Sequence, residues 1–438
     1  MKKIVVVILV FLFCNPLLGQ IKKIEFEEYT LDNGLQVILS QDHSSPVVVV
    51  NICYHVGAKN EIDGRKGFAH LFEHLMFDGS ANVKRGEFDK YIYSAGGNNN
   101  AFTNEDITNY YDILPSHQLE LGLWLESDRM YKFAIGEISL TTQQGVVIEE
   151  KKQSYDNRPY GTVSENMAAI AYKVHPYKTT TIGYEEDIAA ATLNDVKDFF
   201  ETFYVPNNAT LVITGDFDIS KTKKLIEKYF GDIPNGKKEI IRKFPAEPKR
   251  TAQEVKTVYD KIMLDGLFMG YHIPEINHKD MRALDILSDI LSSGRSSRLY
   301  ERMVYTDQIA MQASAGLDAR EDPGLFMFMI ISSGTAAAEE LEKVIYEEIE
   351  KIQINGVDEK ELQKMKNRYE SSFISNLESI YGRAVSLATY KVIQKDANLI
   401  NTDLEKYLGV TTKDIQDVAK KYLNKENSIV LYYKPEPR

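Results

Sequence analysis

Cysteine is scarce in this sequence: there are two in 438 residues, and the first lies in an N-terminal segment with the pattern of an export signal. Two early lysines precede an apolar run at residues 4–13, and a polar stretch follows. The run is too short to span a bilayer as a helix, so we predict that residues 1–20 form a cleavable signal peptide. Bulky Phe13 before Cys14 disfavours lipid attachment. Cleavage leaves Cys53 alone, so we expect an exported protein without internal disulfides, in the periplasm of a Gram-negative bacterium.

An excess of positive charge and further long apolar runs are also missing. The 52 Lys and Arg residues face 64 Asp and Glu residues, which gives a net charge of −12 scattered along the chain. This pattern excludes the basic surface of a nucleic-acid-binding protein. No later stretch is apolar enough to cross a membrane, so we expect no stable membrane span. A glycine-rich phosphate loop and a Ser or Cys nucleophile elbow are absent as well, which argues against those two kinds of chemistry.

Strand-like and helix-like patterns recur in two similar halves. Strand patterns lie at 35–39, 47–56 and 209–214, and helical patterns lie at about 67–77, 117–133, 137–153 and 193–204. Thr192 and Asn208 recur as Thr411 and Asn427 at one offset (411 − 192 = 427 − 208 = 219). Each pair frames a short amphipathic helix that leads into an apolar strand. We therefore predict an α+β protein with two similar halves.

The boundary between the halves is marked by a change in composition. At 236–250, Pro, Gly and charged residues replace the periodic patterns. We predict an N-terminal domain at 21–235, a linker at 236–250, and a structurally related C-terminal domain at 251–438.

The candidate functional residues begin with a histidine pair on the predicted helix at 67–77. His70 and His74 are four residues apart, so they share one helix face and can present two imidazoles to one ion. Glu73 lies between them in sequence and reaches the same side. Ligand, base and ligand in this order are typical of an inverzincin zinc site. The alternative is a buried helix with two incidental histidines, which is a weak competitor because the chain has only 8 His residues.

A catalytic zinc ion takes three protein ligands, so a third is needed. Glu149 and Glu150 end an apolar helical run, and adjacent helical residues are about 100° apart, so only one can face a metal. Glu150 shares a face with Val147 and Gln143 and is the better candidate. Without other context, two glutamates followed by two lysines are more often a solvated helix face.

Taken together, the motifs resemble the insulinase and pitrilysin family of metallopeptidases, in particular half-length members such as the zinc-bearing subunit of mitochondrial processing peptidase and its bacterial relatives. The resemblance covers about 27–235 and is thinner beyond 250. The matching segments are 67–80, 96–103, 146–150, 175–177, 181–183 and 206–209. It implies two α/β-sandwich domains in tandem that form one half of a clamshell-like chamber. It also implies one zinc ion per chain, held by His70, His74 and Glu150, with Glu73 as the general base.

The resemblance further implies an endopeptidase that acts on extended peptides. A glycine-rich turn leads into a short strand whose edge could accept a peptide as an additional strand. In the family, the residues that match Asn100 and Ala101 bind the substrate backbone in this way. Gln143 stands where the family usually has a Glu close to the metal ligands, so metal affinity is expected to differ somewhat.

A second departure from the family concerns a partner. Family members carry an Arg and, seven residues later, a Tyr that hold the substrate backbone opposite the zinc. Counted from Arg298, these positions hold Val304 and Met311 here, and neither side chain can donate the required hydrogen bonds. We therefore expect a related subunit to supply the Arg and Tyr in a heterodimer, with a homodimer as the alternative.

The competing functional class is a non-catalytic assembly or peptide-binding subunit on the same scaffold. A complete ligand set and Glu73 argue against it, since a binding protein needs no base. His55 and His175 lack a metal-ligand spacing and are interpreted as structural. Cys53 lies in a buried-strand pattern and is interpreted as a core residue.

Overall fold

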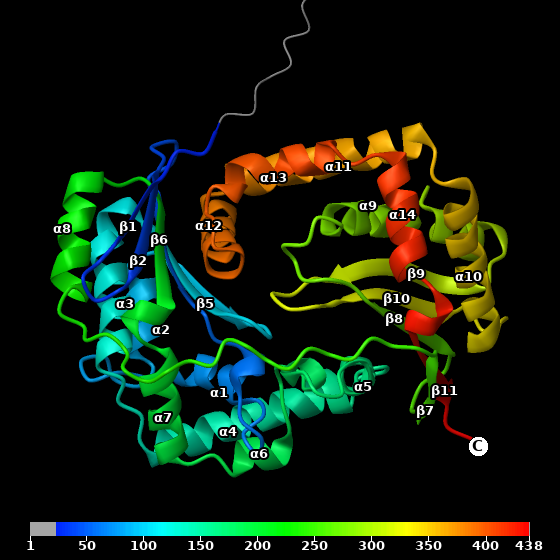
Figure 1. Ribbon diagram of the computed structural model, residues 1–438. Helices are drawn as coiled ribbons and strands as arrows, with labels where there is room; N and C mark the ends of the chain where they lie inside the picture. The colour runs from blue at the N-terminus through cyan, green and yellow to red at the C-terminus, as the bar shows by residue number, and fades with distance from the viewer. Residues whose placement is uncertain (1–22, 438) are drawn as a thin grey trace, which may run out of the picture.

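The computed structural model describes residues 23–437, so the predicted signal peptide at 1–20 lies outside the described residues. The strands are β1 Glu27–Thr30, β2 Gln36–Gln41, β3 Val47–Tyr54, β4 Asn98–Thr103, β5 Thr108–Pro115, β6 Ala209–Gly215, β7 Glu254–Asp260, β8 Gly266–His272, β9 Ala310–Asp318, β10 Leu325–Ser332 and β11 Ser428–Pro435. They form a six-stranded sheet in the order β1-β2-β6-β3-β5-β4 and a five-stranded sheet in the order β7-β11-β8-β10-β9. The chain is thus divided between two sheets (Figure 1).

The second sheet repeats the topology of the first. β2 pairs in parallel with β6, which is antiparallel to β3, and β7 pairs in parallel with β11, which is antiparallel to β8. The remaining pairs, β3-β5-β4 and β8-β10-β9, are all antiparallel. The order β2-β6-β3-β5-β4 in the first sheet therefore matches the order β7-β11-β8-β10-β9 in the second, with the same relative strand directions. This confirms the predicted α+β class with two tandem domains of similar architecture.

The sequence repeat at offset 219 has a structural counterpart. Thr192 and Thr411 each accept a hydrogen bond at the start of a helix, within a capping box. Asn208 and Asn427 each donate from the side-chain amide to the last carbonyl of that helix, at 2.8 Å in both cases. Each asparagine thus fixes the turn from the helix into the following strand.

Helices pack on both sheets. Their bounds are α1 Phe68–Leu75, α2 Glu87–Ser94, α3 Leu119–Tyr131, α4 Glu137–Lys151, α5 Val163–Ala171, α6 Glu185–Ala189, α7 Leu193–Phe203, α8 Ile219–Phe230, α9 Met281–Ser292, α10 Ala338–Asn355, α11 Glu359–Glu378, α12 Ile380–Gln394, α13 Leu399–Leu408 and α14 Thr412–Tyr422. One buried cluster joins the first sheet to α1, α2, α3, α7 and α8, and a second joins the other sheet to α9, α10 and α14. These clusters are the cores of the two tandem units.

Helix α12, from the second half of the chain, packs on the free face of the first sheet (Figure 1). Its residues Leu387 and Ala388 share a buried cluster with Val49 and Val212. The hydroxyl of Thr214 on β6 donates to the first carbonyl of α12 at 2.7 Å. The two halves therefore share apolar surface. Residues 236–250 contain neither helix nor strand, and the exact domain boundaries remain predictions.

A buried ion cluster also joins the halves. Lys59 is 2% exposed, and its Nζ lies 2.8 Å from Asp106 and 2.7 Å from Glu321, which belongs to the second half. His55 Nε2 lies 2.7 Å from the same Glu321 oxygen, Oε2. Because the cluster excludes most solvent, its ion pairs are stronger than exposed ones. His55 thus has a structural role, as the sequence indicated.

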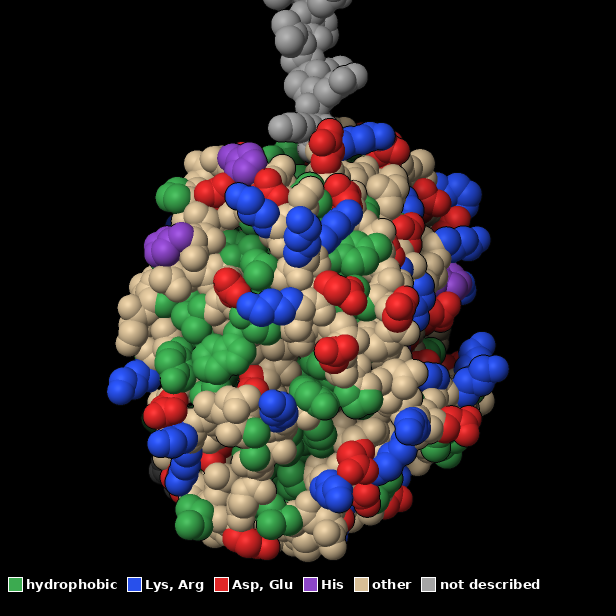
Figure 2. All heavy atoms as spheres, turned by 90° about the vertical axis from the view of Figure 1, so that its left-hand side faces the viewer, with side chains coloured by type: hydrophobic (Ala, Val, Ile, Leu, Met, Phe, Trp, Pro, Cys, Tyr) green, Lys and Arg blue, Asp and Glu red, His purple; other side chains and the backbone are tan. Residues whose placement is uncertain are grey.

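The outer surface over α8 carries acidic and basic side chains side by side (Figure 2). On α8 itself, Lys223 pairs with Glu27 at 2.5 Å and Lys228 pairs with Glu120 at 2.8 Å. Within residues 23–437, no helix is both long and apolar enough to cross a membrane.

Candidate metal centre

Helix α1 is fixed at its start by a buried glutamate. Glu61, which is 6% exposed, accepts hydrogen bonds from the backbone N–H groups of Gly67 at 3.0 Å and Ala69 at 2.8 Å. Gly67 has a φ of 90°, a left-handed conformation that glycine adopts without strain. The apolar face of α1, including Leu71 and Phe72, is buried in the first core. The helix that carries the histidine pair is therefore anchored at its start by hydrogen bonds and along one face by packing.

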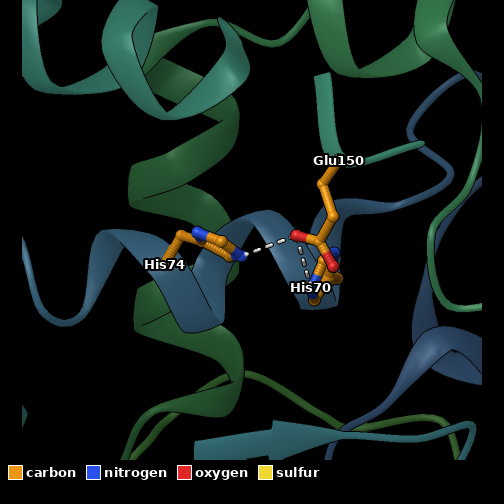
Figure 3. A group of neighbouring side chains, drawn as sticks. All are labelled: His70, His74 and Glu150. Carbon is orange, nitrogen blue, oxygen red and sulfur yellow. Dashed lines mark ion pairs between the residues drawn. The ribbon is translucent and has the colours of Figure 1, made fainter. Parts of the chain in front are cut away.

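Three side chains converge beside this helix. The Nε2 atoms of His70 and His74 lie 3.8 and 3.5 Å from Glu150 Oε2, which reaches across from α4 (Figure 3). One ligand atom from each of the three residues lies within 4.8 Å of the others. Tetrahedral zinc ligands lie about 3.4 Å apart, given metal–ligand distances of about 2.0–2.2 Å. Two imidazoles and a carboxylate at this spacing fit a divalent cation.

Both imidazoles are held in the neutral form that binds metals. Burial, and after it the neighbouring His74, lowers the pKa of His70 to about 4. Burial also lowers the pKa of His74, although Glu150 acts in the opposite direction. Each ring therefore keeps a free lone pair at neutral pH. His70 Nδ1 is buried without a hydrogen-bond partner among the described residues.

Glu73 lies beside the same three residues but bonds elsewhere. Its Oε2 accepts a hydrogen bond of 2.5 Å from the hydroxyl of Thr103 on β4. Burial raises the pKa of Glu73 to about 7, the bond from Thr103 opposes this, and nearby Glu150 adds to it. A carboxyl group with a pKa near neutrality can accept and return a proton, as a general base requires.

The structure brings Glu150 to the histidines and turns Glu149 away. Glu149 is exposed and accepts a hydrogen bond from the side chain of Gln153 at 2.7 Å. Gln143, two turns before Glu150 on α4, donates to Asp78 Oδ1 at 3.0 Å. Asp78 was not predicted as a site residue, because nothing in the local sequence indicates that this aspartate contacts Gln143.

Strand β4 is an edge of the first sheet and lies beside α1. Among residues 23–437 it pairs only with β5, and its Asn100 and Ala101 lie opposite Tyr111 and Tyr110. The side chain of Asn100 accepts a hydrogen bond from the Ala101 N–H at 2.8 Å. The predicted substrate-binding residues are thus on an open edge next to the metal ligands.

Val304 and Met311 lie on the second unit. Val304 is in the π-helix Tyr300–Thr306 and packs against the second core. Met311 is 64% exposed at an irregularity of β9, since Gln312 pairs with Ile331 and Ala310 pairs with Ser332. The extra residue is a β-bulge, which sequence patterns do not reveal.

Of the nearby Arg302 and Tyr305, the arginine is engaged in ion pairs and the tyrosine is exposed. Arg302 is paired with Asp307 at 2.5 Å and with Glu347 at 3.3 Å, and Tyr305 is 69% exposed. His175, interpreted as structural, accepts a bond from the Tyr177 N–H at 3.2 Å.

Two family models match the chain in sequence order. The model described as Insulinase (Peptidase family M16) matches residues 36–185, and the model described as Peptidase M16 inactive domain matches residues 190–369. The zinc protease PqqE of Helicobacter pylori is 34% identical over 412 residues, which cover 93% of each chain. This chain belongs to the insulinase family of peptidases. Another family relative, the mitochondrial-processing peptidase subunit beta of Lentinula edodes, is 22% identical over 90% of this chain and 86% of its own.

Solved structures agree with this membership. The crystal structure of a protease from Helicobacter pylori superposes with a TM-score of 0.91 and 34% identity, over 94% of this chain and 100% of that one. The periplasmic protease PqqL of Escherichia coli gives a TM-score of 0.77 at 18% identity, over 94% of this chain and 48% of its own. The insulinase-family fold therefore occurs both in half-length chains and as half of a longer chain.

Proposed function

We propose that this insulinase-family protein is a zinc-dependent endopeptidase that cleaves extended peptides. One zinc ion per chain would be held by His70, His74 and Glu150. The observation that supports this most directly is the convergence of these three donors beside the buried carboxyl group of Glu73. Relatives named zinc proteases support the same assignment.

The proposed roles follow from the donor chemistry. Zinc at such a site supplies a Lewis acid that acidifies water and polarises a peptide carbonyl. Glu73 would accept a proton from the attacking water on its carboxylate as the carbon–oxygen bond forms. It would then return that proton to the departing amine as the carbon–nitrogen bond breaks. Thr103 holds Glu73 in place, because its hydroxyl donates to one carboxylate oxygen and leaves the other available.

Strand β4 would bind the substrate. A peptide added to its open edge would pair through backbone groups and would displace the Asn100 side chain from the Ala101 N–H. Backbone pairing selects extended chains over folded ones, because a folded protein has few free strand edges. We therefore propose unfolded or extended peptides as the substrate class.

We also propose that a related second subunit completes the active site. Val304 packs against the second core and Met311 is exposed, and neither side chain can donate a hydrogen bond to the substrate backbone. The chain also aligns with 48% of PqqL, so two such chains are needed to match its length. Because residues 1–20 have the sequence pattern of an export signal, we propose that the enzyme works after export, in a bacterial periplasm.

Metal content and cleavage, measured together, test the proposed function. The purified chain should contain one zinc per molecule and should slowly cleave an unstructured, internally quenched peptide. Chelation should stop this cleavage, and added zinc should restore it. Zinc binding without any metal-dependent cleavage, alone or with a partner, would instead favour a peptide-binding subunit.

A further inference from the structure

The turn that follows strand β4 connects the metal centre to the second half of the chain. Residues 104–107 form this turn, and they come directly after Thr103, which donates to Glu73 Oε2. Residues 319–324 join β9 to β10 in the second half, and they contact the turn through side chains and backbone groups. The strand that holds the proposed general base is therefore attached, at this end, to the other half of the chain.

Arg320 bridges the two segments. Its Nη2 lies 3.0 Å from Glu105 Oε1 on the turn and 2.6 Å from Asp318 Oδ2 at the end of β9. Its Nε donates to Asp318 Oδ1 at 3.0 Å. The guanidinium also lies over the ring of Tyr177, 4.6 Å from the ring centroid, and Arg320 is 9% exposed. Removing one partner of such a pair leaves a buried charge uncompensated, so the contact favours this one position of the turn.

The next residue of the turn is held by the same connection. Asp106 Oδ2 accepts a hydrogen bond from the backbone N–H of Glu321 at 2.9 Å, and its Oδ1 accepts one from the hydroxyl of Tyr177 at 2.5 Å. The backbone N–H of Asp322 donates to that hydroxyl at 3.1 Å. The second half thus binds the carboxylates of both Glu105 and Asp106.

The first half holds the backbone of the same turn. The N–H groups of Ala58 and Lys59 donate to the carbonyl oxygens of Asn104 and Glu105 at 3.1 and 3.0 Å. Strand β4 itself has one neighbouring strand among residues 23–437, and an edge strand is easier to displace than a central one. Loss of the contacts from the second half should therefore loosen the turn, and with it Thr103, without releasing either.

We propose that Arg320 is a positioning residue for the reaction: through Glu105 it holds the turn after β4, and through Thr103 it sets the orientation of Glu73. The inference rests on the proposed function, in which Glu73 accepts the proton. The proposed metal ligands and Glu73 all lie in the first half. Arg320 would give the second half of the chain a part in orienting them for catalysis.

A double-mutant cycle on kcat in the full mature chain tests this path, with the partner subunit present if cleavage requires it. The cycle compares the parent, Arg320→Met, Thr103→Val and the double variant. Arg320→Met should lower kcat by about threefold to tenfold, and by no more than Thr103→Val, because it acts through one hydrogen bond to a charged group. Zinc content should not change. In the Thr103→Val background, Arg320→Met should leave kcat unchanged; equal losses in both backgrounds would overturn the proposal.

The two carboxylates that pair with Arg320 form a matched comparison. Glu105 lies on the turn, whereas Asp318 lies on the strand that leads to Arg320 itself. Glu105→Gln should lower kcat as Arg320→Met does, and Asp318→Asn should keep kcat close to the parent value. A merely structural role, in which the carboxylates only compensate the buried charge, would give the two variants the same kcat, and that result would overturn the proposal. Both variants keep the arginine, so this comparison stands if Arg320→Met does not fold.

Arg282→Met is the control for lost stability. Arg282 is 8% exposed and pairs with Asp403 at 2.5 Å, so both partners belong to the second half. This variant should unfold at lower urea concentration and keep the parent kcat; a loss of kcat as large as that of Arg320→Met would overturn the proposal. If Glu73→Gln cleaves at the parent rate, the proposed function fails. If Glu73→Gln is inactive and Arg320→Met cleaves at the parent rate, only this inference fails.

Discussion

Thr103 donates a 2.5 Å hydrogen bond to Glu73, and this bond joins the edge strand β4 to the helix of the metal centre. The strand that would bind the peptide thus also holds the group that would move the proton. A movement of β4 is therefore expected to shift the carboxyl group of Glu73, the proposed general base.

Replacing Thr103 with valine tests this connection. Valine keeps the shape but cannot donate, so Glu73 should lose its orientation and kcat should fall by about tenfold, the usual size for one hydrogen bond to a charged group. KM and zinc content should stay close to the parent values. Thr103→Ser keeps the hydroxyl and should retain activity; equal losses in both variants would point to packing instead.

Comparing variants of the adjacent Glu149 and Glu150 on α4 tests which of them is the third metal ligand. Glu150→Ala should lose both zinc and activity, because one of three ligands is removed. Glu149→Ala should keep both, since Glu149 is exposed and its side chain bonds to Gln153 on its own helix. Zinc analysis of the two purified variants decides the matter, and the reverse pattern would show that Glu149 is the ligand.

Acid should weaken the contact between the two halves by protonating the carboxylate of Glu321. Burial raises the pKa of Glu321, but the hydrogen bond with His55 and the charge of Lys59 outweigh it and lower the pKa to about 2. A carboxyl group with a depressed pKa stabilises the fold above its ordinary pKa of 4.5, and this contribution is lost as the pH falls toward 2.

Urea unfolding at pH 6 and at pH 3 measures this loss. At pH 6 the parent should be more stable than Glu321→Gln, and the difference should shrink at pH 3. A difference that does not change with pH would mean that the Glu321 charge contributes nothing. Glu149→Gln, at an exposed position, serves as the charge-matched control.

The partner proposal predicts poor activity from the isolated chain despite full zinc loading. A related subunit that lacks the metal motif but carries the Arg and Tyr should raise kcat/KM by about tenfold or more, because it would position the substrate backbone. Titration of that subunit against a fixed amount of this chain should reach a plateau at a one-to-one ratio. Full activity from the isolated chain would rule out the heterodimer.

Much of the site follows from local spacing. His70 and His74 share a face because four residues make about one helical turn, and the same periodicity separates Glu150 from Glu149. Thr192 and Thr411 likewise each form a local feature, a helix cap, and each half of the chain forms its own.

What the sequence does not reveal depends on distant partners. The apolar face of α12 shows that the helix is buried, but not that it packs on the first sheet across from Val49 and Val212. Asp78 meets Gln143 across 65 residues, and Lys59 meets Glu321 across 262. Such contacts are set by the tertiary fold, because no local pattern encodes which charged residues will meet.

In the proposed function, His70, His74 and Glu150 hold zinc while Glu73 moves the proton. Glu73→Gln tests it most directly, because glutamine keeps the shape of the side chain but cannot accept a proton. Zinc content and kcat should be measured on the parent and the variant together, with the partner present if it proves necessary. We expect equal zinc content and a kcat lower by about a hundredfold or more in the variant. A variant that cleaves the peptide at close to the parent rate would show that Glu73 is not the general base.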